Sequence, residues 1–271
     1  MQLAIRHETL YRYSAPLTYT IQQLRLTPRS DPHQHCLHWQ INTPGQRHGF
    51  TDAYGNDCHM LTVRGRHEEL RIVAEGVVQI GLLDRGRLVG AEPIPPLVFT
   101  VPTVRTETTD QIRAFAETHF RRATDSAAML ALATSIRGAV AYQSGATDVT
   151  SSATDALALG RGVCQDHAHL FIACCHTRGI PARYVSGYID PGRTDHAETH
   201  AWVDVWVEDD GFTGWVSIDV THARFANDVL CRLAVGRDYE SSAPVRGVRR
   251  GGGHESLTVK VSITARGDNL R

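Results

Sequence analysis

Three residues in the second half of the chain have the chemical types that acyl transfer through a thiol requires: Cys164, His200 and Asp219. A thiolate attacks a carbonyl carbon, a histidine takes and returns its proton, and a carboxylate fixes the histidine tautomer. The chain has six cysteines, without a CxxC pair or the spacing of a small disulfide framework. The first question is therefore whether the local structure prepares one of these thiols for reaction.

Cys164 is predicted to lie in the first turn of a helix. Residues 160–162 contain two glycines that interrupt the chain, and the apolar spacing then predicts a helix from about residue 164 to 178. The free amides and the positive end of the helix dipole favour a thiolate at that position. Cys174 and Cys175 lie late in the same helix, where the dipole has the opposite effect, and are predicted to be packing residues. The alternative for Cys164 is the same packing role, since free cysteines are usually small buried residues.

Two predicted strands follow the helix, and each has one aliphatic face. Residues 200–207 and 215–220 alternate between valine, isoleucine or alanine on one side and polar or aromatic residues on the other. If the strands pair, the aliphatic faces must coincide, because a slip of one residue would expose one of them to water. His200 and Asp219 then lie on the same side of neighbouring strands.

The distance between His200 and Asp219 depends on the connecting turn. A turn centred between residues 209 and 210 places them directly opposite, whereas a longer loop makes them diagonal neighbours within side-chain reach. Asp204 is the competing carboxylate, but it lies four residues along the strand, about 13 Å away. The pattern therefore predicts Asp219 as the residue that orients His200, although a purely structural His–Asp pair is the alternative.

A metal site is the competing interpretation of the same region. Cys164, His167 and His169 are close in sequence, and His196 and His200 have the i,i+4 spacing of helical ligands. However, His167 and His169 would point in different directions on a helix, and the i,i+4 spacing has no such meaning in a strand. The sequence therefore predicts no metal and no cofactor.

Composition limits the classes of partner and the compartment. The chain has 271 residues and a formal net charge of −1, so no basic excess predicts binding to nucleic acid or to a membrane surface. The first residues contain no apolar run, and no stretch reaches membrane-spanning length. A cytoplasmic location with free thiols is therefore expected.

The order of elements predicts an α+β chain of two domains. Residues 1–100 contain strand patterns separated by turn residues, which predict an antiparallel, β-sandwich-like domain. The proline-rich segment 91–102 is interpreted as a linker between domains, the alternative being an ordered loop within one domain. Residues 101–271 are predicted to form a catalytic core of helices followed by strands, including a C-terminal strand.

Four sequence blocks resemble the core of bacterial transglutaminase-like proteins. These blocks are residues 162–170, 179–188, 199–206 and 214–221. Residues 7–29 and 236–253 resemble the N-terminal β-domain and the tail that accompany this core. The resemblance implies a papain-like α+β core, with the nucleophile helix packed on an antiparallel sheet and Cys164, His200 and Asp219 at the catalytic positions. His167 and Val220 depart from the pattern, where an aromatic residue and a proline are expected.

The resemblance does not fix the reaction, because similar proteins are described as transglutaminases, cysteine proteases and amidases. We expect hydrolysis of peptide or isopeptide amides in a peptide or protein substrate. Protein-glutamine transglutaminase activity is the alternative, but no calcium-loop pattern or acceptor-amine site is evident. A non-catalytic binding module on the same fold is the third interpretation, which the intact triad disfavours. The sequence does not indicate the oligomeric state.

The donors that would stabilise a developing oxyanion are harder to predict. The backbone amide of Cys164 is one candidate, and a side chain from Tyr142 or Gln143 is another. Tyr142 could equally be a packing residue. Trp202 shares the polar face of His200, and it is expected either to line the cleft or to pack against the N-terminal domain.

Overall fold

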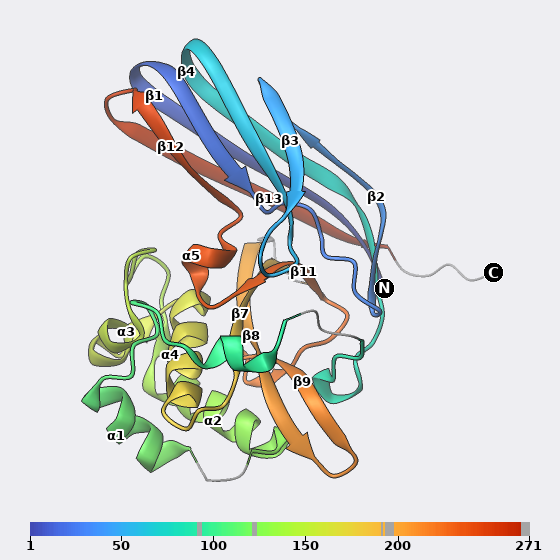
Figure 1. The fold of residues 1–271 in the computed structure, drawn as a ribbon, viewed down its shortest axis with the longest axis vertical. Helices are drawn as coiled ribbons and strands as arrows, with labels where there is room; N and C mark the ends of the chain where they lie inside the picture. Colours follow the sequence, from blue (N-terminus) through green and yellow to red (C-terminus); the bar gives the residue numbers. More distant parts are fainter. Residues whose placement is uncertain (91–93, 121–123, 191, 193–197, 267–271) are drawn as a thin grey trace, which may run out of the picture.

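The computed structural model describes residues 1–90, 94–120, 124–190, 192 and 198–266 (Figure 1). A bent antiparallel sheet lies against a second unit of helices and strands, so the predicted α+β class is confirmed. Part of the predicted linker, residues 91–93, lies outside the described residues. The remaining part of the predicted linker includes a 3-10 turn, Pro96–Thr100, and the Phe99 side chain of this turn is fully buried. In the described part of the chain, no helix combines the length and the apolar character needed to span a bilayer.

The first sheet is built around two long strands that pair along their lengths, β1 (Gln2–Leu24) and β4 (Asp57–Ile80). The shorter strands at its edges are β2 (Gln34–Asn42), β3 (Gln46–Thr51), β12 (Val245–Gly251) and β13 (Glu255–Arg266). The register of β1 shifts between residues 12 and 19, and the sheet bends there. Tyr11 and Leu70 on one side of the bend share a buried cluster with Leu24 and Leu61 on the other. The bent sheet therefore encloses its own core, as a sandwich does.

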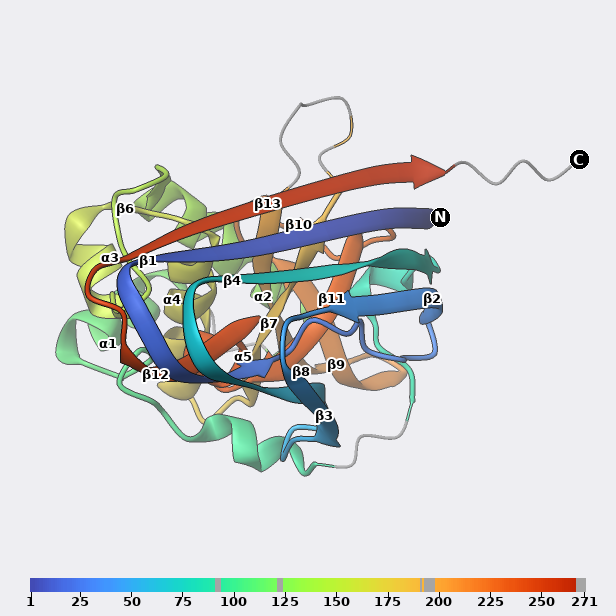
Figure 2. The ribbon, with the colours of Figure 1, turned by 90° about the horizontal axis from the view of Figure 1, so that it is seen from above.

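The last two strands of the chain belong to the first sheet. β12 pairs with residues 17–24 of β1, and β13 pairs with residues 2–13 of the same strand. Figure 2 shows β13 beside β1 along the edge of the sheet. The division near residue 100 stays a prediction, but this pairing places residues 245–266 with the N-terminal strands and not with the core.

The second unit combines helices with a sheet of order β10-β9-β8-β7-β11. Its helices are α1 (Asp110–His119), α2 (Ser126–Ala139), α3 (Ala153–Leu159), α4 (Cys164–His176) and α5 (Tyr239–Ser242). Its strands are β7 (Ala182–Ile189), β8 (Glu198–Asp209), β9 (Phe212–Asp219), β10 (Arg224–Phe225) and β11 (Leu230–Gly236). A separate two-stranded parallel ladder joins β5 (Ala141–Tyr142) to β6 (Arg161–Gly162). The short turn Asp84–Gly86 lies against β9.

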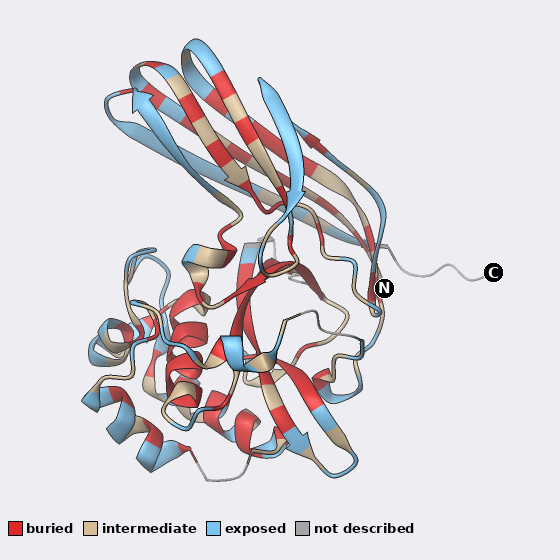
Figure 3. Cartoon of the chain, viewed as in Figure 1, coloured by how far each residue is buried: buried red, intermediate tan, exposed pale blue. Residues whose placement is uncertain are grey.

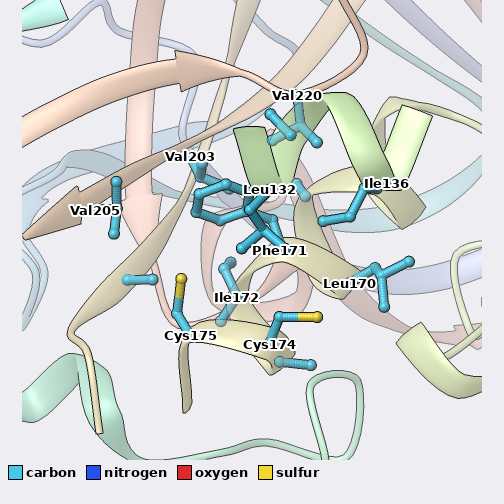
Figure 4. Packing of buried hydrophobic residues seen from close by; sticks show 14 of the residues in the cluster. Leu132, Ile136, Leu170, Phe171, Ile172, Cys174, Cys175, Val203, Val205 and Val220 are labelled. Atoms are coloured by element: carbon cyan, nitrogen blue, oxygen red, sulfur yellow. The ribbon is translucent and has the colours of Figure 1, made fainter. Parts of the chain in front are cut away.

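Helix α4 is the centre of the main core. Almost all of its residues are buried (Figure 3). Phe171 and Ile172 lie in one cluster with Val203 and Val205 of β8, and Leu132 of α2 packs in the same cluster (Figure 4). Each of these side chains contributes about 1.5–3 kcal/mol when it is removed from water. The predicted inward face of the helix and the aliphatic face of the strand are both confirmed.

A buried ionic cluster joins the two units on the other face of the second sheet. Asp204 Oδ2 lies 2.8 Å from Arg183 Nε and 2.6 Å from Arg232 Nη2, and Arg232 Nε lies 3.3 Å from Asp31 of the first unit. Burial alone would raise the pKa of Asp204, but the two guanidinium groups hold it well below its usual range. Asp204 is therefore part of the contact between the units and does not contact His200.

Replacing Asp204 by Asn is expected to lower the free energy of unfolding by about 3–5 kcal/mol, because two buried guanidinium groups lose their counter-charge. Urea titration followed by tryptophan fluorescence measures the change. Asp210→Asn, at an exposed position in the β8–β9 turn, is the control and should stay within about 0.5 kcal/mol of the parent. Equal stabilities for the two variants would contradict a structural role for the cluster.

Candidate active site

Cys164 is the first residue of α4, and the chain before it is held in place by the helix itself. The Asp166 carboxylate accepts hydrogen bonds from the Val163 amide at 2.7 Å and from Thr147 Oγ1 at 2.6 Å. A Cβ atom on Gly162 would lie 2.6 Å from that carboxylate, so the close approach requires glycine. Cys164 is partly exposed, and its position at the helix start agrees with the sequence prediction.

The other five thiols have surroundings that disfavour ionisation. Cys58, Cys174, Cys175 and Cys231 are buried, and burial raises the pKa of the Cys58 thiol to about 11 and of the Cys174 thiol to about 12. Cys36 is exposed, yet partial desolvation still raises the pKa of its thiol. Cys164 therefore differs from the rest by its position at the start of α4.

His200 and Asp219 are diagonal neighbours on adjacent strands. The pairing of β8 with β9 sets Val203 opposite Ile218, and the turn consists of residues 210 and 211. The directly opposite register is thus wrong, and the diagonal alternative is confirmed. His200 Nε2 lies 3.0 Å from Asp219 Oδ1, and the Cys164 side chain also acts on the ring, favouring its protonated form.

The Asp219 carboxylate is fully buried but accepts hydrogen bonds from several groups. Besides His200, it accepts a hydrogen bond from His222 Nδ1 at 2.7 Å and one from the His222 amide at 3.3 Å, and Arg224 Nε lies 3.4 Å away. Burial alone would raise the pKa of Asp219, but the bonds to the two histidines hold it well below its usual range. Sequence reasoning missed His222, and the only signal available was its position three residues after the carboxylate.

The His200 ring favours its protonated form. Burial alone would lower its pKa, but the hydrogen bonds to Asp219 and Cys164 raise it to about 10. The ring also stacks beside Trp202, with centroids 6.1 Å apart and an angle of 27° between the planes. The arrangement therefore stabilises an imidazolium next to the thiol, which is the charge state that a thiolate nucleophile requires.

A cavity of about 290 Å³ opens beside Cys164 and His200, between the two units. The second unit contributes these two residues and Gln165, among others. Residues of β1 and β13 line the side that belongs to the first unit. The candidate nucleophile therefore faces a space that neither unit encloses alone.

The other residues predicted for the site lie apart from this cavity. Tyr142 is an exposed residue of β5 and the exposed Gln143 follows it, whereas Trp202 is buried in a cluster with Tyr54 and Leu83. None of the three lines the cavity. Gln165 does line it, and its buried Nε2 has no hydrogen-bond partner among the described residues.

The histidines of the competing metal interpretation have other partners. His167 Nε2 lies 2.9 Å from the Val140 carbonyl oxygen and its Nδ1 lies 3.0 Å from Thr221 Oγ1, which connects α4 to α2 and to the loop after β9. His169 Nε2 accepts a hydrogen bond from the Tyr239 amide. His196 lies outside the described residues.

One group within the described part of the chain has its ligand atoms close enough together to hold a metal ion: His200, Asp219 and His222, all within 4.8 Å. These atoms are the ones that form the hydrogen bonds given above. An ion at this place would have to replace the bond that orients His200.

Comparisons with known proteins cover both units. The bacterial transglutaminase-like N-terminal region matches residues 3–79, and the transglutaminase-like superfamily matches residues 112–220. An uncharacterized protein of Mycobacterium leprae (strain TN) is 32% identical over 279 residues, covering 97% of this chain and 98% of that protein. An uncharacterized protein of Mycobacterium tuberculosis (strain H37Rv) is 29% identical over 270 residues, covering 90% of this chain and 86% of that protein. The crystal structure of a "putative cysteine protease" from Cytophaga hutchinsonii has a TM-score of 0.80 at 22% identity, covering 100% of this chain and 92% of that one.

The raised pKa of His200 predicts a specific pH dependence. Its proton stabilises the folded chain fully below about pH 6.5, the value for the unfolded state, and this stabilisation is lost as the pH rises toward about 10. Side-chain ¹H–¹⁵N NMR should therefore show an imidazolium at position 200 at pH 8. Asp219→Asn should move the titration midpoint downward, whereas Asp210→Asn should leave it unchanged. A midpoint below pH 7 in the parent protein would contradict the arrangement.

Proposed function

Because the chain belongs to the bacterial transglutaminase-like superfamily, we propose that it is an enzyme that transfers acyl groups through a thioester on Cys164. The observation that supports this most strongly is that Cys164 and His200 line one cavity while His200 is hydrogen-bonded to the buried Asp219. The favoured reaction is hydrolysis of a peptide or isopeptide amide in a peptide or protein substrate.

The first half of the proposed reaction forms the thioester. In the reactive state the thiol proton resides on His200, at the ring nitrogen that Asp219 does not hold, and the sulfur attacks the carbonyl carbon of the amide as a thiolate. The carbonyl electrons move to the oxygen, and the tetrahedral intermediate collapses when the carbon–nitrogen bond breaks. The departing amine takes the proton from His200. Asp219 remains ionised and stabilises the imidazolium.

The second half releases the acyl group. Water attacks the thioester carbonyl while His200 takes one of its protons, the carbon–sulfur bond breaks, and the proton returns to the sulfur. A carboxylic acid leaves, and the thiol is restored. In the transglutaminase alternative, a primary amine replaces water in this step and the residues keep the same roles.

Two donors are proposed for the developing oxyanion. The backbone amide of Cys164 lies in the first turn of α4, where amides have no partner within the helix. The side-chain amide of Gln165 is proposed as the second, since its Nε2 is buried and unpaired among the described residues and Gln165 lines the same cavity. A buried donor without a partner is costly to the fold, and a functional role accounts for that cost.

The cavity lining favours water over an amine as the second acceptor. Among the described residues that line it, none is an aspartate or a glutamate. A protonated amine thus finds no carboxylate there, and no group is evident that would bind it in preference to water.

Offering an activated acyl ester together with a millimolar primary amine should yield mainly the hydrolysed acid, because nothing in the cavity concentrates the amine. Mass spectrometry of the products gives the ratio of acid to amide. Cys164→Ala should give neither product above the uncatalysed rate. A predominance of amide would favour the transglutaminase alternative with the same three residues.

Gln165→Met keeps the shape of the side chain but removes the proposed oxyanion donor. We expect kcat to fall by about 10²-fold or more with little change in KM. The free energy of unfolding should stay the same or rise, since an unpaired buried amide is removed. Gln143→Met is the control at the alternative position and should change kcat by less than about twofold. The reverse ranking of the two variants would assign the donor role to Gln143.

A further inference from the structure

The first unit presents a neutral face to the cavity and a charged face to solvent. On β1, His7, Thr9 and Tyr11 line the cavity. Glu8 and Arg12 of the same strand point the other way, where Glu8 pairs with Arg71 at 3.0 Å and Arg12 pairs with Glu69 at 3.1 Å. Side chains alternate between the two faces of a strand, so this separation of charge follows directly from the sequence of β1.

Strand β13 has the same alternation. Leu257 and Val259 line the cavity, whereas Thr258 and Lys260 lie on the outer face with Glu8 and its neighbours. Leu257 is 53% exposed and Val259 is 45% exposed. The side of the cavity formed by β13 is therefore an apolar surface that is left uncovered next to Cys164.

A third exposed apolar residue lies at the same cavity but comes from the second unit. Val149, in the loop before α3, is 54% exposed and lines the cavity together with the β13 side chains. Exposed apolar side chains from two different units thus meet at one opening. Covering them with an apolar group would gain about 25 cal/mol for each Å² removed from water.

Apart from the proposed catalytic pair, the cavity has no charge to offer a substrate. Its described lining contains no lysine, arginine, aspartate or glutamate. His7 is the remaining histidine, and burial lowers its pKa to about 4, so it is neutral at pH 7. Both of its ring nitrogens have partners, Tyr188 at 2.8 Å and Thr9 at 3.0 Å. An ionised group brought to the part of the cavity that the first unit lines would lose water without gaining a counter-charge.

From these observations we propose that the cavity binds the group that carries the reacting carbonyl, and that Leu257 and Val259 of β13 select an uncharged, mainly apolar side chain on it. The cavity volume of about 290 Å³ is at the lower end for ligand sites, which suits one side chain and not a long segment. This inference rests on the proposed function, because it assigns the specificity of the same site. It makes the N-terminal sheet a part of substrate recognition.

The test compares p-nitrophenyl esters of N-acetyl-leucine and N-acetyl-glutamate. The parent protein should have a kcat/KM for the leucine ester at least about tenfold above that for the glutamate ester. Leu257→Lys places a cation in the cavity and should lower this ratio by about tenfold or more, mainly through KM. Thr258→Lys, on the outer face of the same strand, should leave the ratio unchanged.

A preference of the parent for the glutamate ester, or equal ratios for the two lysine variants, would overturn the inference. A binding measurement separates this outcome from failure of the proposed function. Cys164→Ala, which cannot form a thioester, should bind N-acetyl-leucine amide more tightly than N-acetyl-glutamate amide in an NMR titration. If the parent turns over neither ester, the proposed function fails, and this titration still decides whether the cavity selects an uncharged group.

Discussion

The packing of β8 and β9 against α4 fixes the geometry on which the proposed chemistry depends. Val203 and Val205 must face the helix to stay out of water, and a slip of one residue would turn them to the opposite side of the sheet. This constraint places His200 and Asp219 together on the other face. The same helix begins at Cys164, so one hydrophobic contact determines the positions of all three side chains.

Two buried aspartates on the same face of this sheet have contrasting partners. Asp204 is paired with Arg183 and Arg232, whose guanidinium groups keep their protons at any physiological pH, so the cluster is a fixed contact between the units. Asp219 is paired with the imidazole rings of His200 and His222, and an imidazole, unlike a guanidinium, can release and take up a proton during a reaction. The partner, and not the carboxylate, therefore decides which of the two can take part in proton transfer.

Local patterns were sufficient to predict much of the core. The helix start at Cys164 agrees with the sequence prediction, because it depends on residues a few positions apart. The shared face of His200 and Asp219 also followed from alternation. The register of β8 against β9 was ambiguous, because the sequence determines the length of a turn less well than it determines the period of a strand.

Features that depend on distant segments could not be predicted in this way. The pairing of β13 with β1 joins residues more than 240 positions apart, and no local signal selects one sheet edge over another. The unpaired amide of Gln165 and the contribution of Leu257 to the cavity are consequences of that pairing and of the packing between the units. The residues proposed to bind substrate were thus harder to find than those proposed to react with it.

Labelling with an electrophilic acyl probe tests the central claim most directly. A leucine acyloxymethyl ketone alkylates a thiol that is activated next to a binding site, and peptide mapping identifies the modified residue. We expect a single labelled peptide that contains Cys164, and we expect the labelling to be lost in His200→Ala. Labelling of the exposed Cys36 at a comparable rate, or labelling of Cys164 that does not depend on His200, would contradict the account.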